Sequence, residues 1–125
     1  MVTGEYVYDL PERVLRLSKT IRSCTVIDKS GDVIASKTRK NLQPLITQQN
    51  GYRQALQAAM RHFTRPSWAR NLGEMYYTAS RYEKVIGVTI PVGDKYLALV
   101  AFDKDTNAYD KIIMKKILPS IKTVY

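Results

Sequence analysis

Histidine and cysteine often act as bases, nucleophiles and metal ligands, and this chain has one of each, His62 and Cys24. A nucleophile activated by imidazole would have to use His62. A zinc site needs three or four ligands, which this pair cannot supply without carboxylates. Cys24 falls in a β-rich stretch, where a buried thiol is inert. His62 lies late in a predicted helix, where a histidine suits the C-terminal dipole. We expect a structural role for Cys24, a structural or surface role for His62, and no metal.

Phosphate chemistry also lacks its usual residues. No G-x-x-x-x-G-K-[ST] motif occurs, and the six glycines are isolated. The carboxylates are scattered, mostly at predicted turns and helix starts, where aspartate bonds to the backbone: Asp28, Asp32, Glu74, Glu83, Asp94, Asp103, Asp105 and Asp110. Two of them can still meet in space as an acid and a base, but their scatter favours a protein that is not an enzyme and has no cofactor.

The chain is strongly basic, with 20 Lys and Arg against 11 Asp and Glu, a formal charge of +9. This balance favours nucleic acid, an acidic membrane surface or an acidic protein as partner. The bases are spread without a run of five, so solvated faces are the favoured interpretation over a dedicated polyanion site. The candidate surface for an anionic partner consists of Lys37, Arg39, Lys40, Arg61, Arg65 and Arg70.

Nine tyrosines are the other unusual feature, and Tyr76 and Tyr77 fall in a predicted strand. With Arg70 and Arg81 they form a candidate platform for single-stranded nucleic acid, where bases stack on rings and phosphates meet arginine. Alternatively, tyrosine rings pack in a core or a dimer seam with the hydroxyl at the edge. The second interpretation is favoured.

The length of 125 residues suits one domain, 1–125, with a core at about 10–122. Its 45% apolar content is typical of a globular protein. No apolar run approaches the roughly 20 residues of a membrane span. The first residues lack the pattern of a secretion signal, and a single cysteine suits a reducing compartment, so we expect a cytoplasmic protein.

The apolar pattern predicts helices and strands in a definite order. A first helix follows Asp9, which can cap it, with Pro11 in its first turn; its stripe is Leu10, Val14, Leu17 and Ile21. A hairpin of residues 25–28 and 33–37 follows, then a second helix within 42–63 that ends before Pro66, with Asn50-Gly51 as an interruption. Strands are predicted at 74–82, 85–91 and 96–103. A last helix from 107 is stopped or kinked at Pro119.

Alternate residues of a strand point to opposite faces of the sheet. In the hairpin "EKVIGVTIPVGDKYLALVAFD" the residues of both faces are mainly apolar. A sheet with one wet face would alternate apolar and polar residues. Two apolar sets therefore predict helices on both faces, with these two strands near the centre. The fold class is α+β, in the order α-β-β-α-β-β-β-α around a mainly antiparallel five-stranded sheet.

This order, together with the hairpins "VIDKSGDVIAS" and "VIGVTIP–GDKYLALVAFD", resembles the roadblock / dynein-light-chain type of profilin-like domain. More narrowly, it is similar to short archaeal proteins of that type whose role is uncharacterised. The resemblance implies a sheet order of 2-1-5-4-3, with the first and last helices on one face and the middle helix on the other. It also implies homodimers formed by the middle helix and the third strand, here residues 54–63 and 75–80.

The function that this implies is a non-catalytic, dimeric interaction platform. Its partners would be a second copy, a related roadblock or longin-like subunit, or a small GTPase. The expected interface residues are Tyr52, Leu56, Met60, Tyr76 and Tyr77. Two alternatives stay open: a nucleic-acid-binding protein that uses the bases and tyrosines, and a sensory domain that encloses a small ligand under one helix.

Overall fold

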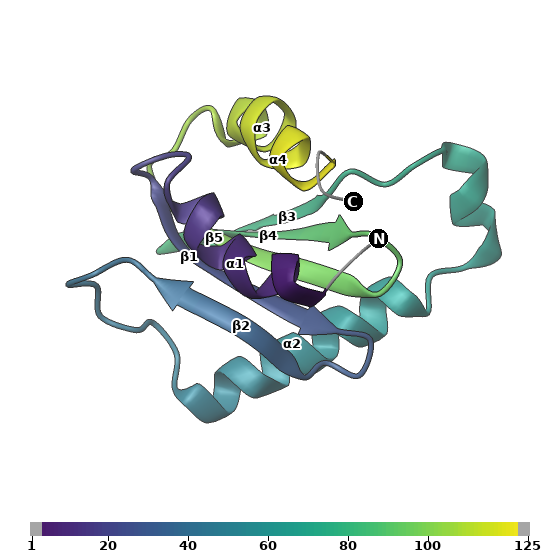
Figure 1. The fold of residues 1–125 in the computed structure, drawn as a ribbon, viewed down its shortest axis with the longest axis horizontal. Coiled ribbons are helices and arrows are strands. Elements are labelled where there is room, and N and C mark those ends of the chain that lie inside the picture. Colours follow the sequence, from purple (N-terminus) through teal and green to yellow (C-terminus); the bar gives the residue numbers. More distant parts are fainter. Residues whose placement is uncertain (1–3, 123–125) are drawn as a thin grey trace.

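The computed structural model describes residues 4–122, which form one sheet with helices on both faces (Figure 1). The first half of the chain comprises α1 (Gly4–Leu15), β1 (Ile21–Asp28), β2 (Val33–Thr38) and α2 (Gln48–Phe63). A short 3-10 helix, η1 (Ser67–Leu72), then precedes β3 (Thr78–Arg81), β4 (Val85–Val92) and β5 (Tyr96–Asp103). The chain ends in one helical stretch, α3 (Tyr109–Ile112), η2 (Ile113–Ile117) and α4 (Leu118–Lys122).

The sheet has five antiparallel strands in the order β2-β1-β5-β4-β3, which confirms the expected topology. β5 is the central strand and pairs along its length with both β1 and β4. β2 and β3 are the two edge strands. The sheet therefore presents two free backbone edges on opposite sides.

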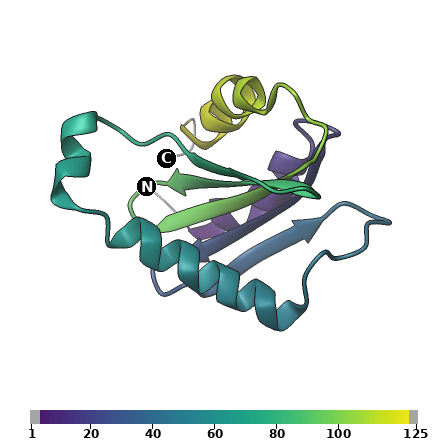
Figure 2. The same ribbon diagram turned by 180° about the vertical axis from the view of Figure 1, so that it is seen from behind.

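The two faces of the sheet are buried by different helices, as the doubly apolar hairpin predicts (Figures 1 and 2). One face packs under α1 and the C-terminal helix, and its core includes Ile86, Val88, Ala98, Val100 and Phe102. The other face packs against α2 through a smaller cluster, which consists of Ile27, Ala55, Ala58, Ala59 and Leu97. On this second face Val85, Gly87 and Thr89 of β4 are only half-buried, so α2 covers it incompletely.

The first helix differs from its prediction. It spans Gly4–Leu15, so Asp9 lies inside it instead of capping it, and Pro11 is in its interior. Val7, one turn before Leu10, is fully buried, which extends the apolar stripe toward the N-terminus. The helix ends at Leu15, and Ile21, predicted as its last apolar position, opens β1.

The second helix is continuous through Asn50 and Gly51, which were predicted to interrupt it. Thr47 caps it, because its hydroxyl accepts a hydrogen bond from the Asn50 backbone N–H at 3.1 Å. Leu45 and Ile46 precede the helix, which begins six residues after the start of its predicted range. The helix ends at Phe63, three residues before Pro66, as the position of that proline predicts.

β3 is shorter than its predicted span of 74–82, and Pro91 explains where it begins. The Tyr82 N–H donates to the Val85 carbonyl at the turn between β3 and β4. Hydrogen-bonded and non-bonded residue pairs alternate in an antiparallel ladder, so from this pair on, every second pair of residues between the two strands is hydrogen-bonded. In the observed register, Thr78 pairs with Thr89 and belongs to the hydrogen-bonded set. The next hydrogen-bonded pair, two residues further along, would be Tyr76 with Pro91. Pro91 has no N–H to donate, so the ladder stops at Thr78.

The C-terminal helix is distorted where the sequence places Pro119. Proline lacks the N–H for the fourth carbonyl before it and its ring collides with that turn. Residues Ile113–Ile117 form a π-helical turn before the proline, in which the Leu118 N–H donates to the Ile113 carbonyl five residues earlier. The helix thus continues to Lys122 with a local distortion, the second of the two predicted outcomes.

We predict that Gly31→Ala destabilises the protein more than Gly93→Ala does. Both glycines have positive φ, +84° and +63°, which costs another residue about 1–2 kcal/mol. A Cβ on Gly31 would also lie 2.7 Å from the Leu56 Cα, whereas nothing lies within 4 Å of one on Gly93. Urea unfolding of both variants measures the difference. Equal losses would show that the turn can move away from α2 at no cost.

Candidate interaction surfaces

The middle helix α2 leaves its large apolar side chains outside the core. Ala55, Ala58 and Ala59 face the sheet and are buried, and their small size lets the helix lie close to β1. Tyr52, Leu56 and Met60 follow one another at a spacing of four and are 55%, 48% and 58% exposed. These three residues form one row along the helix. We call this row the α2 stripe.

The α2 stripe lies on the flank of the helix that faces β2. Gly31, in the turn between β1 and β2, lies against the backbone of Leu56. Gln54 and Leu56 are turned roughly 100° to either side of the buried Ala55, so Gln54 occupies the other flank. Val33 of β2 pairs with Ile27 and so shares the α2 face of the sheet. The exposed apolar residues around the stripe are Val33, Leu45 and Ile46.

Tyr76 and Tyr77 do not join the α2 stripe, because they precede β3 at the opposite edge of the sheet. Tyr77 packs against the main core, and its hydroxyl donates to Asp110 at the start of the C-terminal helix. This bond raises the pKa of Tyr77 to about 12, with smaller contributions from burial and from the Asp110 charge. Tyr76 is 44% exposed, and the Lys122 ammonium lies 5.5 Å from the centre of its ring.

The six basic residues predicted as one surface lie in separate places. Lys37 is on β2 and Lys40 follows it, whereas Arg61 is on α2. Arg65 and Arg70 lie beyond the end of α2. The six therefore come from three separate segments of the chain, and their role as one anion-binding surface stays a prediction.

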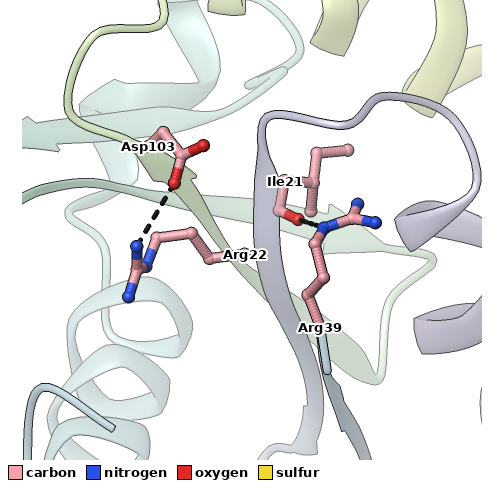
Figure 3. A network of polar contacts seen from close by, with 4 residues as sticks. All are labelled: Ile21, Arg22, Arg39 and Asp103. Carbon is pink, nitrogen blue, oxygen red and sulfur yellow. Dashed lines mark hydrogen bonds and ion pairs between the residues drawn. The ribbon is translucent and has the colours of Figure 1, made fainter. Parts of the chain in front are cut away.

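Arg39 has a role in the fold that the sequence did not reveal. Its Nε donates to the Ile21 carbonyl at 2.9 Å (Figure 3). Its Nη2 donates to the carbonyls of Leu15 at 3.0 Å and Ser18 at 2.9 Å. The guanidinium thus ties the negative C-terminal end of α1 to β1.

An ion pair also joins β1 to the end of the central strand. The Arg22 Nη1 lies 3.2 Å from Asp103 Oδ1 (Figure 3). Arg22 is largely buried while Asp103 is about half exposed, so the pair is partly shielded from water. Neither residue was singled out from the sequence as part of a pair, because they are 81 positions apart.

Residues 64–77 leave the body of the molecule as a projecting arm, which carries η1 (Figure 2). Between this arm, the C-terminal helix and the turn from β4 to β5 lies a groove of about 1110 Å³. The arm contributes Trp68, Arg70 and Tyr76 to it, and Leu118 and Ile121 contribute from α4. Trp68 is 61% exposed and Leu72 is 77% exposed. The groove brings together Arg70 and Tyr76, which the sequence assigned to one candidate nucleic-acid platform, with Arg65 from the candidate anionic-partner surface.

Neither of the reactive residue types sits in an activated setting. Cys24 is fully buried in β1, and burial raises the pKa of its thiol to about 12. Partial burial and the nearby Arg65 guanidinium lower the pKa of His62. Among residues 4–122, no group of three or more metal-ligating side chains comes together. In the same range, no helix has the length and apolar character needed to cross a membrane.

Comparison with known proteins supports the fold through structure alone. No family model and no curated protein matches this sequence. The gliding protein MglB from Thermus thermophilus superposes with a TM-score of 0.72 at 19% identity, over 99% of this chain and 93% of that one. The Roadblock/LC7 domain from Streptomyces avermitilis gives 0.69 at 12% identity, over 94% and 92%. The chain has the roadblock fold.

A third solved structure, described as MglB with tetrameric arrangement, gives a TM-score of 0.67 at 16% identity over 100% of this chain and 96% of that one. All three roadblock neighbours are matched over nearly their full lengths, so the resemblance extends to the whole domain. The expected closeness to archaeal members stays a prediction.

We predict that Tyr77→Phe destabilises the protein at neutral pH and that this effect shrinks as the pH rises from about 10 to 12. The pKa of Tyr77 in the folded protein, about 12, is above the ordinary value near 10 of the unfolded chain. The stabilisation is therefore complete below about pH 10 and is lost as pH rises through 12. Urea unfolding of both proteins between pH 8 and pH 12 measures it, with Tyr76→Phe as the control. A constant difference across this range would contradict the role of the hydroxyl.

Proposed function

We propose that this protein is a non-catalytic, dimeric interaction platform of the roadblock type. Its partner in the dimer is a second copy or a related roadblock or longin-like subunit, and the assembly scaffolds or regulates a small GTPase or a related complex. The observation that carries this proposal is the α2 stripe, an apolar row left exposed on a helix whose other side is buried.

The energetics favour a partner on this stripe. Full burial of a Leu or Met side chain stabilises by roughly 1.5–3 kcal/mol. Burying the exposed half of such a side chain in an interface therefore contributes about 1 kcal/mol to the free energy of association. Three such residues in each of two subunits give about 6 kcal/mol, which is at the low end of the roughly 4–15 kcal/mol cost of association. The neighbouring Val33, Leu45 and Ile46 are exposed as well and supply the additional apolar area.

The edge strands offer a second route to association. β3 ends the sheet on one side and β2 on the other, and an edge strand leaves backbone groups free for another chain. The resemblance to roadblock domains implies pairing through β3. The α2 stripe lies on the flank toward β2, so an interface that uses the stripe involves the other side of the helix from one that uses β3.

The positive net charge of the chain favours an acidic binding partner. A net charge of +9 raises the rate at which a negatively charged partner arrives, independently of the contacts made after docking. Lys37 and Lys40 lie on and just after β2, the strand next to the α2 stripe. A partner that approaches this flank therefore meets both apolar and basic groups.

We predict that Leu56→Glu combined with Met60→Glu converts a dimer to a monomer at micromolar concentration. Each charge would be placed in the middle of an apolar contact, where it has no partner and its desolvation is costly. Both sites are exposed in the subunit, so the effect on folding should stay within about 1 kcal/mol. Light scattering coupled to gel filtration measures the mass, and circular dichroism confirms the fold.

Gln54→Glu is the matched control, since it adds charge to the opposite flank of the same helix. Tyr76→Glu tests the side of the molecule next to β3. Dissociation by either of these changes, with no effect from the double variant, would move the interface to the β3 side. A monomer in the unsubstituted protein at this concentration would rule out self-association.

A further inference from the structure

The groove under the arm exists because the segment before Thr78 is not paired with β4. Pro91 ends the ladder between β3 and β4, so residues 74–77 separate from the sheet and lead into the arm. The resulting space of about 1110 Å³ is slightly larger than the usual range for small-molecule pockets. It lies between the arm (Figure 2), the end of the C-terminal helix and the β4–β5 turn, and its walls come from all three.

Two aromatic rings line this groove and are accessible to a ligand. Trp68 is 61% exposed and Tyr76 is 44% exposed. Trp68 extends from a 3-10 helix that buries none of its residues. An indole ring kept in water on a projecting arm gains free energy when another flat, apolar surface stacks on it.

Cations stand beside these rings. Arg65 and Arg70 line the groove, and neither forms an ion pair among the described residues. Arg65 instead donates to the Met75 sulfur at 3.4 Å, a weak bond that a phosphate oxygen would replace. Lys122 stands on the other wall, 3.8 Å from Glu74 and over the Tyr76 ring.

We propose that this groove binds single-stranded nucleic acid. Bases stack on Trp68 and Tyr76 while Arg65, Arg70 and Lys122 contact phosphates. Stacking requires unpaired bases, which excludes a continuous duplex. This site is separate from the α2 stripe, so it adds a function to the proposed platform and does not depend on it.

An acidic polypeptide is the competing occupant, and the composition of the groove argues against it. Carboxylate recognition uses the arginines but leaves the two exposed rings without a role. Glu74 and Asp94 also line the groove, and Asp94 has no ion-pair partner among the described residues. These carboxylates repel phosphates and an acidic peptide alike, so the two exposed rings, on which bases can stack, are what favours nucleic acid.

The test uses fluorescein-labelled oligo(dT) and oligo(U) of about 15 nucleotides and the whole protein. Fluorescence anisotropy measures affinity, and the emission of Trp68, the single tryptophan, reports on stacking. Binding should quench this emission. With three phosphates contacted, the logarithm of the binding constant should fall with a slope of about −2 against the logarithm of salt concentration.

Substitutions then separate stacking from charge. Trp68→Ala should weaken binding roughly 5- to 150-fold, the range for the loss of one stacked base. Arg65→Gln with Arg70→Gln should reduce the salt slope to about −0.7. The matched control is Arg53→Gln with Lys115→Gln, which removes the same charge from exposed positions that do not line the groove. It should change the slope little, and the mass in solution should be the same for all variants.

Three outcomes would overturn the proposal. One is the absence of binding to either oligonucleotide at low salt. Another is equal weakening by the groove pair and the control pair, which would show that only net charge attracts the ligand. The third is binding of a polyglutamate peptide that is as tight as that of the oligonucleotides and equally sensitive to Trp68→Ala, which would assign the groove to acidic polypeptides.

Discussion

The structure depends on burying both faces of a central strand that has no polar side. β5 places Ala98, Val100 and Phe102 on one face and Leu97 with Leu99 on the other. A strand of this kind is stable only between two covering layers, because either face in water would expose a row of apolar side chains. Pairing with β1 and β4 satisfies its backbone, and the helices have to supply the rest.

The two covers are built differently, and the difference creates the α2 stripe. α1 and the C-terminal helix bury large residues such as Leu10, Ile113 and Ile117. α2 contacts the sheet mainly through alanines, which bring its axis close but bury little area. Its large apolar residues are consequently on the flank, where its own chain does not cover them. Because α2 packs on the sheet through small residues, its larger apolar residues remain exposed as a surface that a partner can use.

Sequence patterns predicted what depends on neighbours along the chain. The alternation in residues 85–103 predicted two buried faces, and Pro66 and Pro119 predicted an end and a distortion of helices. The start of β3 could not be predicted in this way, because it depends on Pro91 meeting Tyr76 across a ladder whose register is set in three dimensions. The same holds for Arg39, whose guanidinium bonds to carbonyls 18 to 24 positions away. The groove was missed because its walls come from three distant segments.

Two prolines and a row of alanines together separate the two candidate surfaces. Pro66 lies just after the end of α2 and Pro91 prevents β3 from starting early, so the arm between them cannot lie along the sheet. The groove thus opens toward the C-terminal helix at the β3 side, while the α2 stripe faces the β2 side. The groove includes His62 and Phe63 at the end of α2 but none of the three stripe residues, so the two surfaces share no residue. Pro66 and Pro91 also line the groove, so the two residues that set it apart from the α2 stripe form part of its wall.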